Sequence, residues 1–241
     1  KRERKVIGEN LLNGNANILI GTHAILEDSV VFKKLGLVVI DEQHRFGVAQ
    51  RAKMWAKGKP SPHILVMTAT PIPRTLAMTF YGDLDVSVID ELPPGRKPIS
   101  TLHRFDSHRL KLFTFIKEEV KKGRQVYIVY PLIQESEKLD FNNLMDGYES
   151  ISRAFPLPEF KVSIVHGQMK TDDKQIEMNR FVKGETNIMV ATTVIEVGVN
   201  VPNASIMVIE SAERFGLSQL HQLRGRVGRG SDKSYCILMT G

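Results

Sequence analysis

The sequence predicts an α/β protein made of two parallel-sheet domains in tandem. Eight apolar stretches of strand length recur along the chain, and segments of helix length lie between most of them. Alternating strands and helices are typical of parallel sheets, because each parallel pair needs a long crossover connection. The stretch ELPPGRKP at 91–98 is the only strong break and is interpreted as an interdomain linker. We therefore expect a first domain at 1–95 and a second at 96–241.

The two predicted domains differ in how complete they look. The first holds three convincing strands and a weaker one at 86–89, and it opens in the middle of a helix, so we expect its N-terminal part to be missing. The second holds enough strands for a whole small α/β domain. It should include a helix over 107–123 that ends at a glycine, and a loop at FPLP, 155–158. The expected strands lie within 17–24, 35–44, 63–71, 124–132, 161–169, 186–194, 204–211 and 234–241.

Composition limits the classes of protein that the chain can belong to. Its 241 residues are 42% hydrophobic and 25% charged, which is typical of soluble globular proteins. No apolar run reaches membrane-spanning length and the start KRERK has no signal-peptide core, so we expect a cytoplasmic protein without membrane contact. The single cysteine, Cys236, excludes an internal disulfide and a cysteine-based metal cluster. The net charge of +6 permits binding to a polyanion but does not require it.

The stretch LVVIDEQH at 37–44 predicts a ligand site. Four aliphatic residues without polar alternation are typical of a strand buried on both faces. Asp41 and Glu42 follow directly, at the carboxyl end of the strand, where ligands bind in open α/β sheets. The alternative is that Asp41 only caps a following helix.

No phosphate-binding loop of the pattern GxxxxGK[ST] accompanies these carboxylates. The only Gly-Lys pair, at 58–59, is followed by Pro60 and is interpreted as a turn. Either the site has another chemistry, or its phosphate cradle lies upstream of Lys1.

A second candidate site lies in QLHQLRGRVGR at 219–229. Arg224, Arg226 and Arg229 follow closely on one another, and such charges repel unless an anion compensates them. Planar guanidinium groups suit phosphate. The alternative is an exposed basic helix end that binds only counterions.

Four strings resemble, in order, motifs II, III, V and VI of superfamily 2 helicases: DEQH at 41–44, TATPIPR at 68–74, ATTVIEVGVNVP at 191–202 and QLHQLRGRVGR at 219–229. The longer strings DEQHRFGV, LPPGRKPI and ERFGLSQLHQLRGRVGRG are similar to the RecG family of branched-DNA translocases. The transcription-repair coupling translocase Mfd is similar in the last motif but typically has DEEH where this chain has Gln43. Motifs I and Ia are not found, in keeping with a first domain that lacks its N-terminal part.

The resemblance implies two RecA-like domains that bind ATP and Mg²⁺ between them. It assigns Mg²⁺ binding to Asp41 and the handling of the attacking water to Glu42. It implies that Gln43 and His44 sense the nucleotide. The remaining nucleotide-site residues that it implies are the arginine fingers Arg226 and Arg229, with Gly198 and Gln222 at the border of the same cleft.

The resemblance also implies a sequence-independent grip on DNA phosphates by hydroxyls and backbone N–H groups. Thr68 and Thr70 would couple the two domains, or cap a local helix, or do both. Each threonine at a strand end has the same local alternative, in which it caps a helix. Trp55 is interpreted as part of a half-buried helix and not as a platform on which bases stack. The implied nucleic-acid contacts are Thr22 and His23 in motif Ib, His166 and Gly167, and Thr192 and Thr193 in motif V.

The function implied is the motor of an ATP-dependent DNA helicase that remodels branched DNA, such as stalled forks and Holliday junctions. One alternative is a nucleic-acid-binding module without catalysis, whose binding would depend on salt and ignore nucleotide. Another is the motor of a transcription-repair coupling translocase. A small-molecule kinase is disfavoured because it needs no second sheet that carries a Gly-Arg-x-Gly-Arg string.

We predict that this chain by itself hydrolyses ATP only at the background rate, because its sequence contains no Walker A pattern to hold the triphosphate. Phosphate release by the purified chain, with and without DNA, checks this, and the full-length parent protein serves as the positive control. Appreciable turnover by a clean preparation would mean that the phosphate cradle lies elsewhere in these residues.

Overall fold

The computed structural model describes residues 2–42, 57–58, 60–68, 85–131, 137–192, 201–230 and 232–241. The chain forms two units, Lys1–Leu84 and Asp85–Gly241. The expected boundary at 95/96 stays a prediction. Residues 85–99 contain neither helix nor strand and belong to the second unit.

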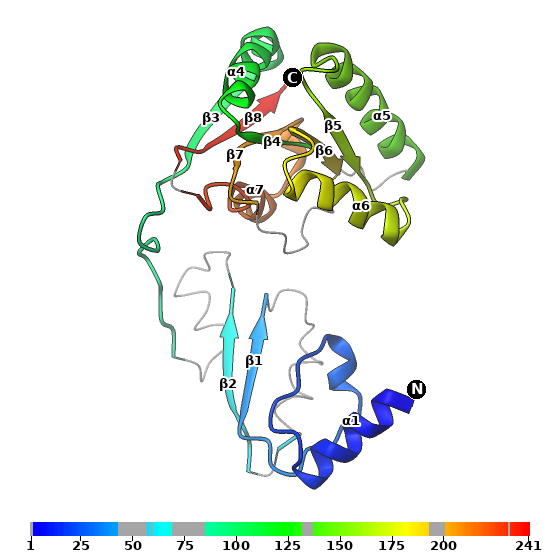
Figure 1. Ribbon diagram of the computed structural model, residues 1–241. Helices are drawn as coiled ribbons and strands as arrows, with labels where there is room; N and C mark the ends of the chain where they lie inside the picture. Colours follow the sequence, from blue (N-terminus) through cyan, green and yellow to red (C-terminus); the bar gives the residue numbers. More distant parts are fainter. Residues whose placement is uncertain are drawn as a thin grey trace. The chain divides into compact units, whose positions relative to one another are not determined.

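The second unit is built on a six-stranded parallel sheet with the strand order β3-β8-β7-β4-β6-β5 (Figure 1). After β4 the chain runs to β5 and β6 on one side, and then crosses to β7 and β8 on the other. The order therefore reverses between β4 and β7, which makes the sheet doubly wound. Its strands are β3 (Ser100–Phe105), β4 (Gln125–Tyr130), β5 (Val162–Val165), β6 (Ile188–Thr192), β7 (Ala204–Ile209) and β8 (Tyr235–Thr240).

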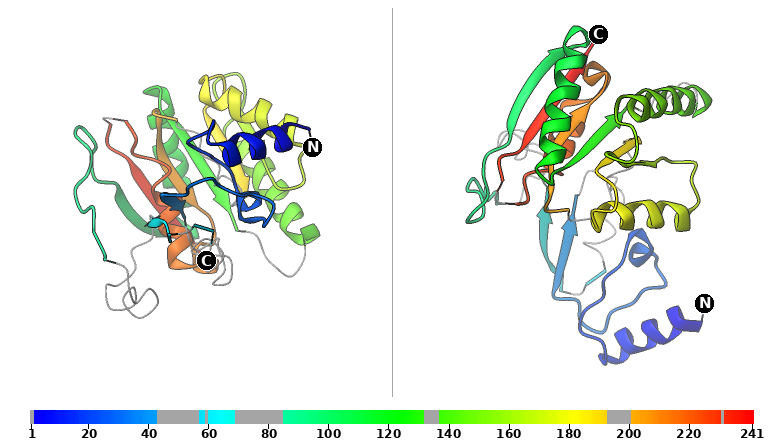
Figure 2. Two further views of the ribbon diagram at one scale, coloured as in Figure 1. Left: turned by 90° about the horizontal axis from the view of Figure 1, so that it is seen from below. Right: turned by 45° about the horizontal axis from the view of Figure 1, so that its top comes forward.

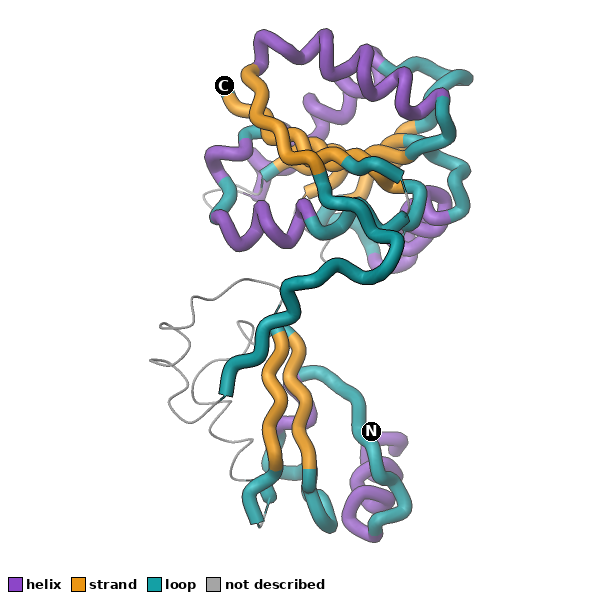
Figure 3. Tube along the Cα trace, turned by 90° about the vertical axis from the view of Figure 1, so that its left-hand side faces the viewer, coloured by secondary structure: helices purple, strands orange, loops and turns teal. Residues whose placement is uncertain are grey.

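Helices cover both faces of this sheet, as Figure 3 shows in a side view. Alternate residues of β4 point to opposite faces, so Val126 and Ile128 join one core cluster and Tyr127 and Val129 join the other. The first cluster includes residues of α4 and α5, and the second includes residues of α6 and α7. These helices are α4 (Arg109–Lys121), α5 (Glu137–Ala154), α6 (Thr171–Val182) and α7 (Leu217–Arg224), and the short helices η3 (Asp106–His108) and η5 (Ala212–Arg214) precede α4 and α7.

Local sequence signals explain where α4 and α5 end. The helix predicted over 107–123 is confirmed as α4, and Gly123 follows it with φ +84°, a left-handed conformation that glycine adopts without steric cost. The loop predicted at FPLP is confirmed, since α5 ends at Ala154 and β5 begins at Val162.

The first unit contains two parallel strands, β1 (Leu37–Asp41) and β2 (His63–Met67), together with α1 (Arg2–Asn13) and the short helix η1 (His23–Leu26) (Figures 1 and 2). Val38 and Ile40 pack on Leu26, whereas Leu37 and Val39 are more than half exposed. The expectation that this strand is buried on both faces is therefore wrong for the described residues, because only one face carries a packing partner.

Two strand predictions fail in the described part of the chain, and one strand was missed. Residues 17–24 contain no strand, and Ile18 and Ile20 are 81% and 91% exposed. Residues 86–89 also contain no strand. The missed strand, β3, reads STLHRF and lies at the edge of the sheet. An edge strand with an exposed face needs no continuous apolar run, so the pattern used for the other strands could not find it.

Gly147 lies in the middle of α5, where its missing side chain admits the ring of Tyr130. A Cβ atom at this position would lie 2.4 Å from Cζ of Tyr130 and 2.6 Å from its hydroxyl oxygen. These separations are far below van der Waals contact, so a side chain here must displace the ring or the helix.

We predict that Gly147→Ala lowers the free energy of unfolding by about 1 to 3 kcal/mol, because overpacking outweighs the helix propensity gained. Urea unfolding followed by circular dichroism measures the change. Ser150→Ala, at an exposed position of the same helix, is the matched control and should change stability by less than about 0.5 kcal/mol. A stabilising effect of Gly147→Ala would contradict the packing described.

Candidate functional site

The two predicted carboxylates lie at the carboxyl end of β1. Asp41 is the last residue of the strand and is exposed. Glu42 is half-buried and has φ +50°, a left-handed conformation that costs a non-glycine residue about 1 to 2 kcal/mol. Such strain persists only where the surrounding structure fixes the backbone, and it concentrates at functional sites.

Thr68 lies at the same edge of the sheet as these carboxylates. It directly follows β2, whose last residue, Met67, pairs with Asp41 across the two parallel strands. The structure therefore brings Asp41, Glu42 and Thr68 together at one edge. Gln43, His44 and Thr70 lie outside the described residues.

Thr22 and His23 begin the short helix η1 of the first unit. Thr22 is exposed, has an extended conformation with φ −102°, and makes no side-chain capping hydrogen bond. The local alternative, in which Thr22 serves as a helix cap, therefore has no support in this structure. The side chain of His23 is outside the described part of the chain.

In the second unit, the predicted nucleic-acid contacts end two neighbouring strands. His166 and Gly167 follow β5, and Thr192 ends β6, which pairs with β5. All three residues therefore lie at the carboxyl edge of the sheet. Thr192 is 2% exposed, so its hydroxyl is not available to an external phosphate in this conformation. Thr193 and Gly198 fall outside the described residues.

Two features of its surroundings disfavour the charged form of His166. Burial lowers the pKa of its imidazole below 6.5, and the positive charge of Lys174 lowers it further. The Lys174 ammonium donates a hydrogen bond to the carbonyl oxygen of Gly167 at 2.8 Å. An imidazole and an ammonium group thus lie close together after β5. Both can donate hydrogen bonds, which suits a phosphate oxygen.

The predicted arginine fingers lie at the opposite edge of this sheet, where its strands begin. Gly230 lies against the carbonyl oxygen of Pro202, two residues before β7. The backbone N–H of Ser100, the first residue of β3, donates to the carbonyl of Ser234, which precedes β8. The turn at 225–230, which follows α7 and carries Arg226 and Arg229, is therefore at the amino edge of the sheet.

The side chains of the two predicted arginine fingers differ in their exposure to solvent. Arg226 is half-buried, like Gln222 in α7, whereas Arg229 is exposed. Both guanidinium groups lie close enough to Tyr127 for their charges to lower the pKa of its phenol, although burial dominates and raises that pKa to about 12. No ion pair involves Arg229 among the described residues.

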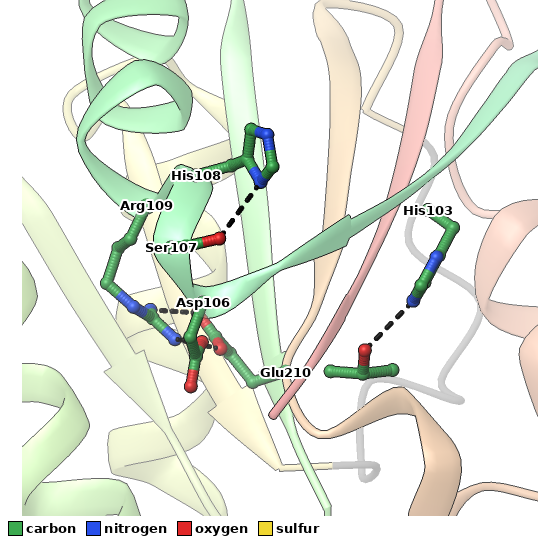
Figure 4. Close-up of polar contacts among 7 residues, drawn as sticks. His103, Asp106, Ser107, His108, Arg109 and Glu210 are labelled. Carbon is green, nitrogen blue, oxygen red and sulfur yellow. Dashed lines mark hydrogen bonds and ion pairs between the residues drawn. The ribbon is translucent and has the colours of Figure 1, made fainter.

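An ion pair that the sequence did not reveal lies where β7 ends. Glu210 follows β7 and is 4% exposed. Arg109, at the start of α4, donates to both of its carboxylate oxygens, at 2.7 and 2.9 Å, and to Asp106 at 2.6 Å (Figure 4). The hydrogen bond to Glu210 raises the pKa of Arg109, which outweighs the effect of its burial. The available signal was VIES at 208–211, an aliphatic run followed by an acid, as at Asp41.

The described residues contain no group of three or more His, Cys, Asp or Glu side chains that could hold a metal ion. They also contain no helix that is long and apolar enough to cross a membrane.

Comparisons with known proteins agree with this arrangement. The DEAD/DEAH box helicase family model matches residues 1–79, and the helicase conserved C-terminal domain model matches residues 108–231, more than half of the chain. The chain belongs to the superfamily 2 helicases. The two RecA-like domains predicted for such a helicase are thereby confirmed.

The predicted likeness to RecG is also confirmed. The chain is 56% identical to the ATP-dependent DNA helicase RecG of Synechocystis sp., over 99% of the chain and 28% of the relative. It is 54% identical to RecG of Bacillus subtilis, over 99% of the chain and 35% of the relative. This helicase chain thus spans about a third of the length of these relatives.

Solved structures show the same likeness. A structure of RecG bound to a three-way DNA junction superposes with a TM-score of 0.73 at 46% identity, over 100% of this helicase chain and 30% of that one. Dbp5 of S. cerevisiae, bound to RNA and ADP BeF3, matches with a TM-score of 0.58 at 14% identity over 93% of the chain and 59% of Dbp5. The second match shows a shared fold only.

We predict that Arg109→Met destabilises the second unit by about 3 kcal/mol, because it leaves the carboxylate of Glu210 buried without its partner. Urea unfolding measures the loss. Arg153→Met is the control: Arg153 pairs with Glu149 at 3.7 Å on the exposed surface of α5, and its loss should cost less than about 1 kcal/mol. Adding Glu210→Gln to Arg109→Met should recover part of the stability. Equal effects of the two arginine substitutions would contradict the prediction.

Proposed function

We propose that this chain is part of the motor of an ATP-dependent DNA helicase that remodels branched DNA. The observation that carries the proposal is the 46% identity, over the whole chain, to RecG bound to a three-way DNA junction. The relatives at 51 to 56% identity are named ATP-dependent DNA helicases. Because bacterial chromosomes lie in the cytoplasm, the proposal places the protein there.

The residues at the end of β1 suit a magnesium site. Mg²⁺ usually keeps several waters and binds one or two carboxylates together with nucleotide phosphates. The exposed carboxylate of Asp41 at the strand edge meets this requirement, so Asp41 would hold the ion. When bound, Mg²⁺ neutralises charge on the phosphate oxygens of ATP.

Glu42 would orient the attacking water and accept its proton. The left-handed backbone of Glu42 turns the chain away from the strand direction directly after Asp41. The two carboxylates therefore need not follow the regular geometry of β1. Half-burial limits the number of positions that the side chain can take. These features support a role in which Asp41 binds the ion and Glu42 handles the proton.

Arg226 and Arg229 would contact the phosphates of ATP. A guanidinium group placed on a transferring phosphoryl group is worth about 10³ to 10⁵ in rate in related NTPases. The exposure of Arg229, and its lack of an ion pair within the described residues, support this role. Gln222, half-buried in α7, would border the same nucleotide.

The nucleic-acid contacts would grip the DNA backbone without reading its bases. Thr22 of the first unit and the group formed by His166, Gly167 and Lys174 in the second offer hydroxyl, imidazole and ammonium donors. Donors of these kinds bind phosphates of any sequence. Cycles of ATP binding and hydrolysis that alter one grip relative to the other would move the protein along DNA.

We predict that Glu42→Gln in the full-length parent protein lowers DNA-stimulated ATP hydrolysis by about 10² to 10⁴-fold, because an amide cannot accept the proton of the attacking water. Steady-state phosphate release measures the rate, and fluorescence anisotropy with a labelled three-way junction should show unchanged DNA binding. Glu9→Gln, at an exposed position of α1, is the control and should keep full activity. Retention of most activity by Glu42→Gln would remove Glu42 from this role.

A further inference from the structure

Residues 93–96, near the start of the second unit, make a tight turn beside the arginine fingers. The backbone N–H of Arg96 donates to the carbonyl oxygen of Pro93 at 3.1 Å, and Gly95 has φ +82°. Proline in the second position and a left-handed glycine in the third are typical of a type II β-turn. The string PPGR at 93–96 therefore fixes the direction in which the Arg96 side chain leaves the backbone.

Arg96 is bonded to the turn that carries the fingers. Its Nε–H donates to the carbonyl oxygen of Gly228 at 2.8 Å, in a half-buried position. Gly228 lies between the two predicted fingers in sequence, two residues after Arg226 and one before Arg229. A single hydrogen bond thus joins the PPGR turn to the peptide that separates the fingers.

Packing fixes the same peptide from a second side. Gly228 has φ +74°, and a Cβ atom there would lie 2.9 Å from Cγ1 of Ile99. Val227 is fully buried, and the N–H of Ser100 is bonded to the carbonyl of Ser234 at 2.9 Å. Residues 96–100 therefore pack against the turn at 225–230 at the amino edge of the sheet.

We propose that Arg96 is a positioning residue for Arg226 and Arg229, so that the PPGR turn at 93–96 holds the fingers in their active geometry. The inference rests on the proposed function, because it takes the two arginines as fingers. A displacement of about 1 Å in a catalytic group can cost about 10²-fold in rate. The rate of hydrolysis would then depend on the conformation of residues 93–100 of the second unit.

The test compares Arg96→Ala with Lys97→Ala in the full-length parent protein. Lys97 is the next residue, carries the same charge and is exposed, so its loss removes a positive charge without touching the fingers. We expect Arg96→Ala to lower kcat of DNA-stimulated ATP hydrolysis by about 10 to 100-fold, with KM for ATP and affinity for a labelled three-way junction within about twofold of wild type. Lys97→Ala should leave all three values unchanged. Equal kinetics for Arg96→Ala and wild type would overturn the inference.

A second background separates positioning from general damage to the fold. Arg226→Ala together with Arg229→Ala removes the fingers, and single-turnover hydrolysis with labelled ATP measures the slow rate that remains. Adding Arg96→Ala to this background should change the rate by less than about twofold, because residues that act as one unit are not additive. The same factor of loss in both backgrounds would mean that Arg96 acts through stability alone, and would overturn the inference.

The finger variants also separate this inference from the proposed function. If Arg226→Ala and Arg229→Ala hydrolyse ATP at the wild-type rate, the finger role fails and the inference fails with it. If they lose activity while Arg96→Ala keeps it, the inference alone fails and the proposed function stands.

Discussion

The burial of one parallel sheet on both faces is the constraint on which the second unit depends. A parallel sheet has two apolar faces, and both must be shielded from water. The crossover helices that connect its strands pack on these faces and cover them. The alternation of β4 shows this directly: Ile128 meets α4 and α5, and Val129 meets α6 and α7. With both faces closed, only the two edges of the sheet and the turns there remain for contact with ligands.

The two edges carry different chemistry. His166 and Gly167 end a strand at the carboxyl edge, beside the ammonium of Lys174. Arg226 and Arg229 lie at the amino edge, in a turn packed against the start of β3. Helix α7 joins the edges, since the chain leaves β7 at the carboxyl edge and reaches the arginine turn after Arg224. The two groups thus lie at opposite ends of the strands, and α7 leads the chain from one end to the other.

Asp41 and Glu210 show that one sequence pattern, an acid at the end of an aliphatic strand, can occur in two different environments. Asp41 is the last residue of β1 and Glu210 directly follows β7, and each precedes a non-glycine residue with positive φ, Glu42 at 50° and Ser211 at 48°. Asp41 is exposed, whereas Glu210 is buried and bonded to Arg109 through both oxygens. An exposed carboxylate can bind an ion, whereas a buried carboxylate that is already paired depends on its partner, whose removal would leave an uncompensated charge. The exposure of each carboxylate and its charged neighbours distinguish the two roles, and the local sequence does not.

The sequence predicted the fold class, the helicase family and most strands of the second unit, because buried parallel strands need long aliphatic runs. It also placed Asp41 at a strand end. It missed β3, whose edge position tolerates polar residues, and it assigned to 17–24 a strand that the described residues do not form. Three features depend on the three-dimensional fold and not on any local pattern: Thr192 is buried, Arg109 pairs with Glu210, and Arg96 donates to Gly228. These contacts join residues 101 and 132 positions apart, and no local pattern encodes which distant partner a side chain will meet.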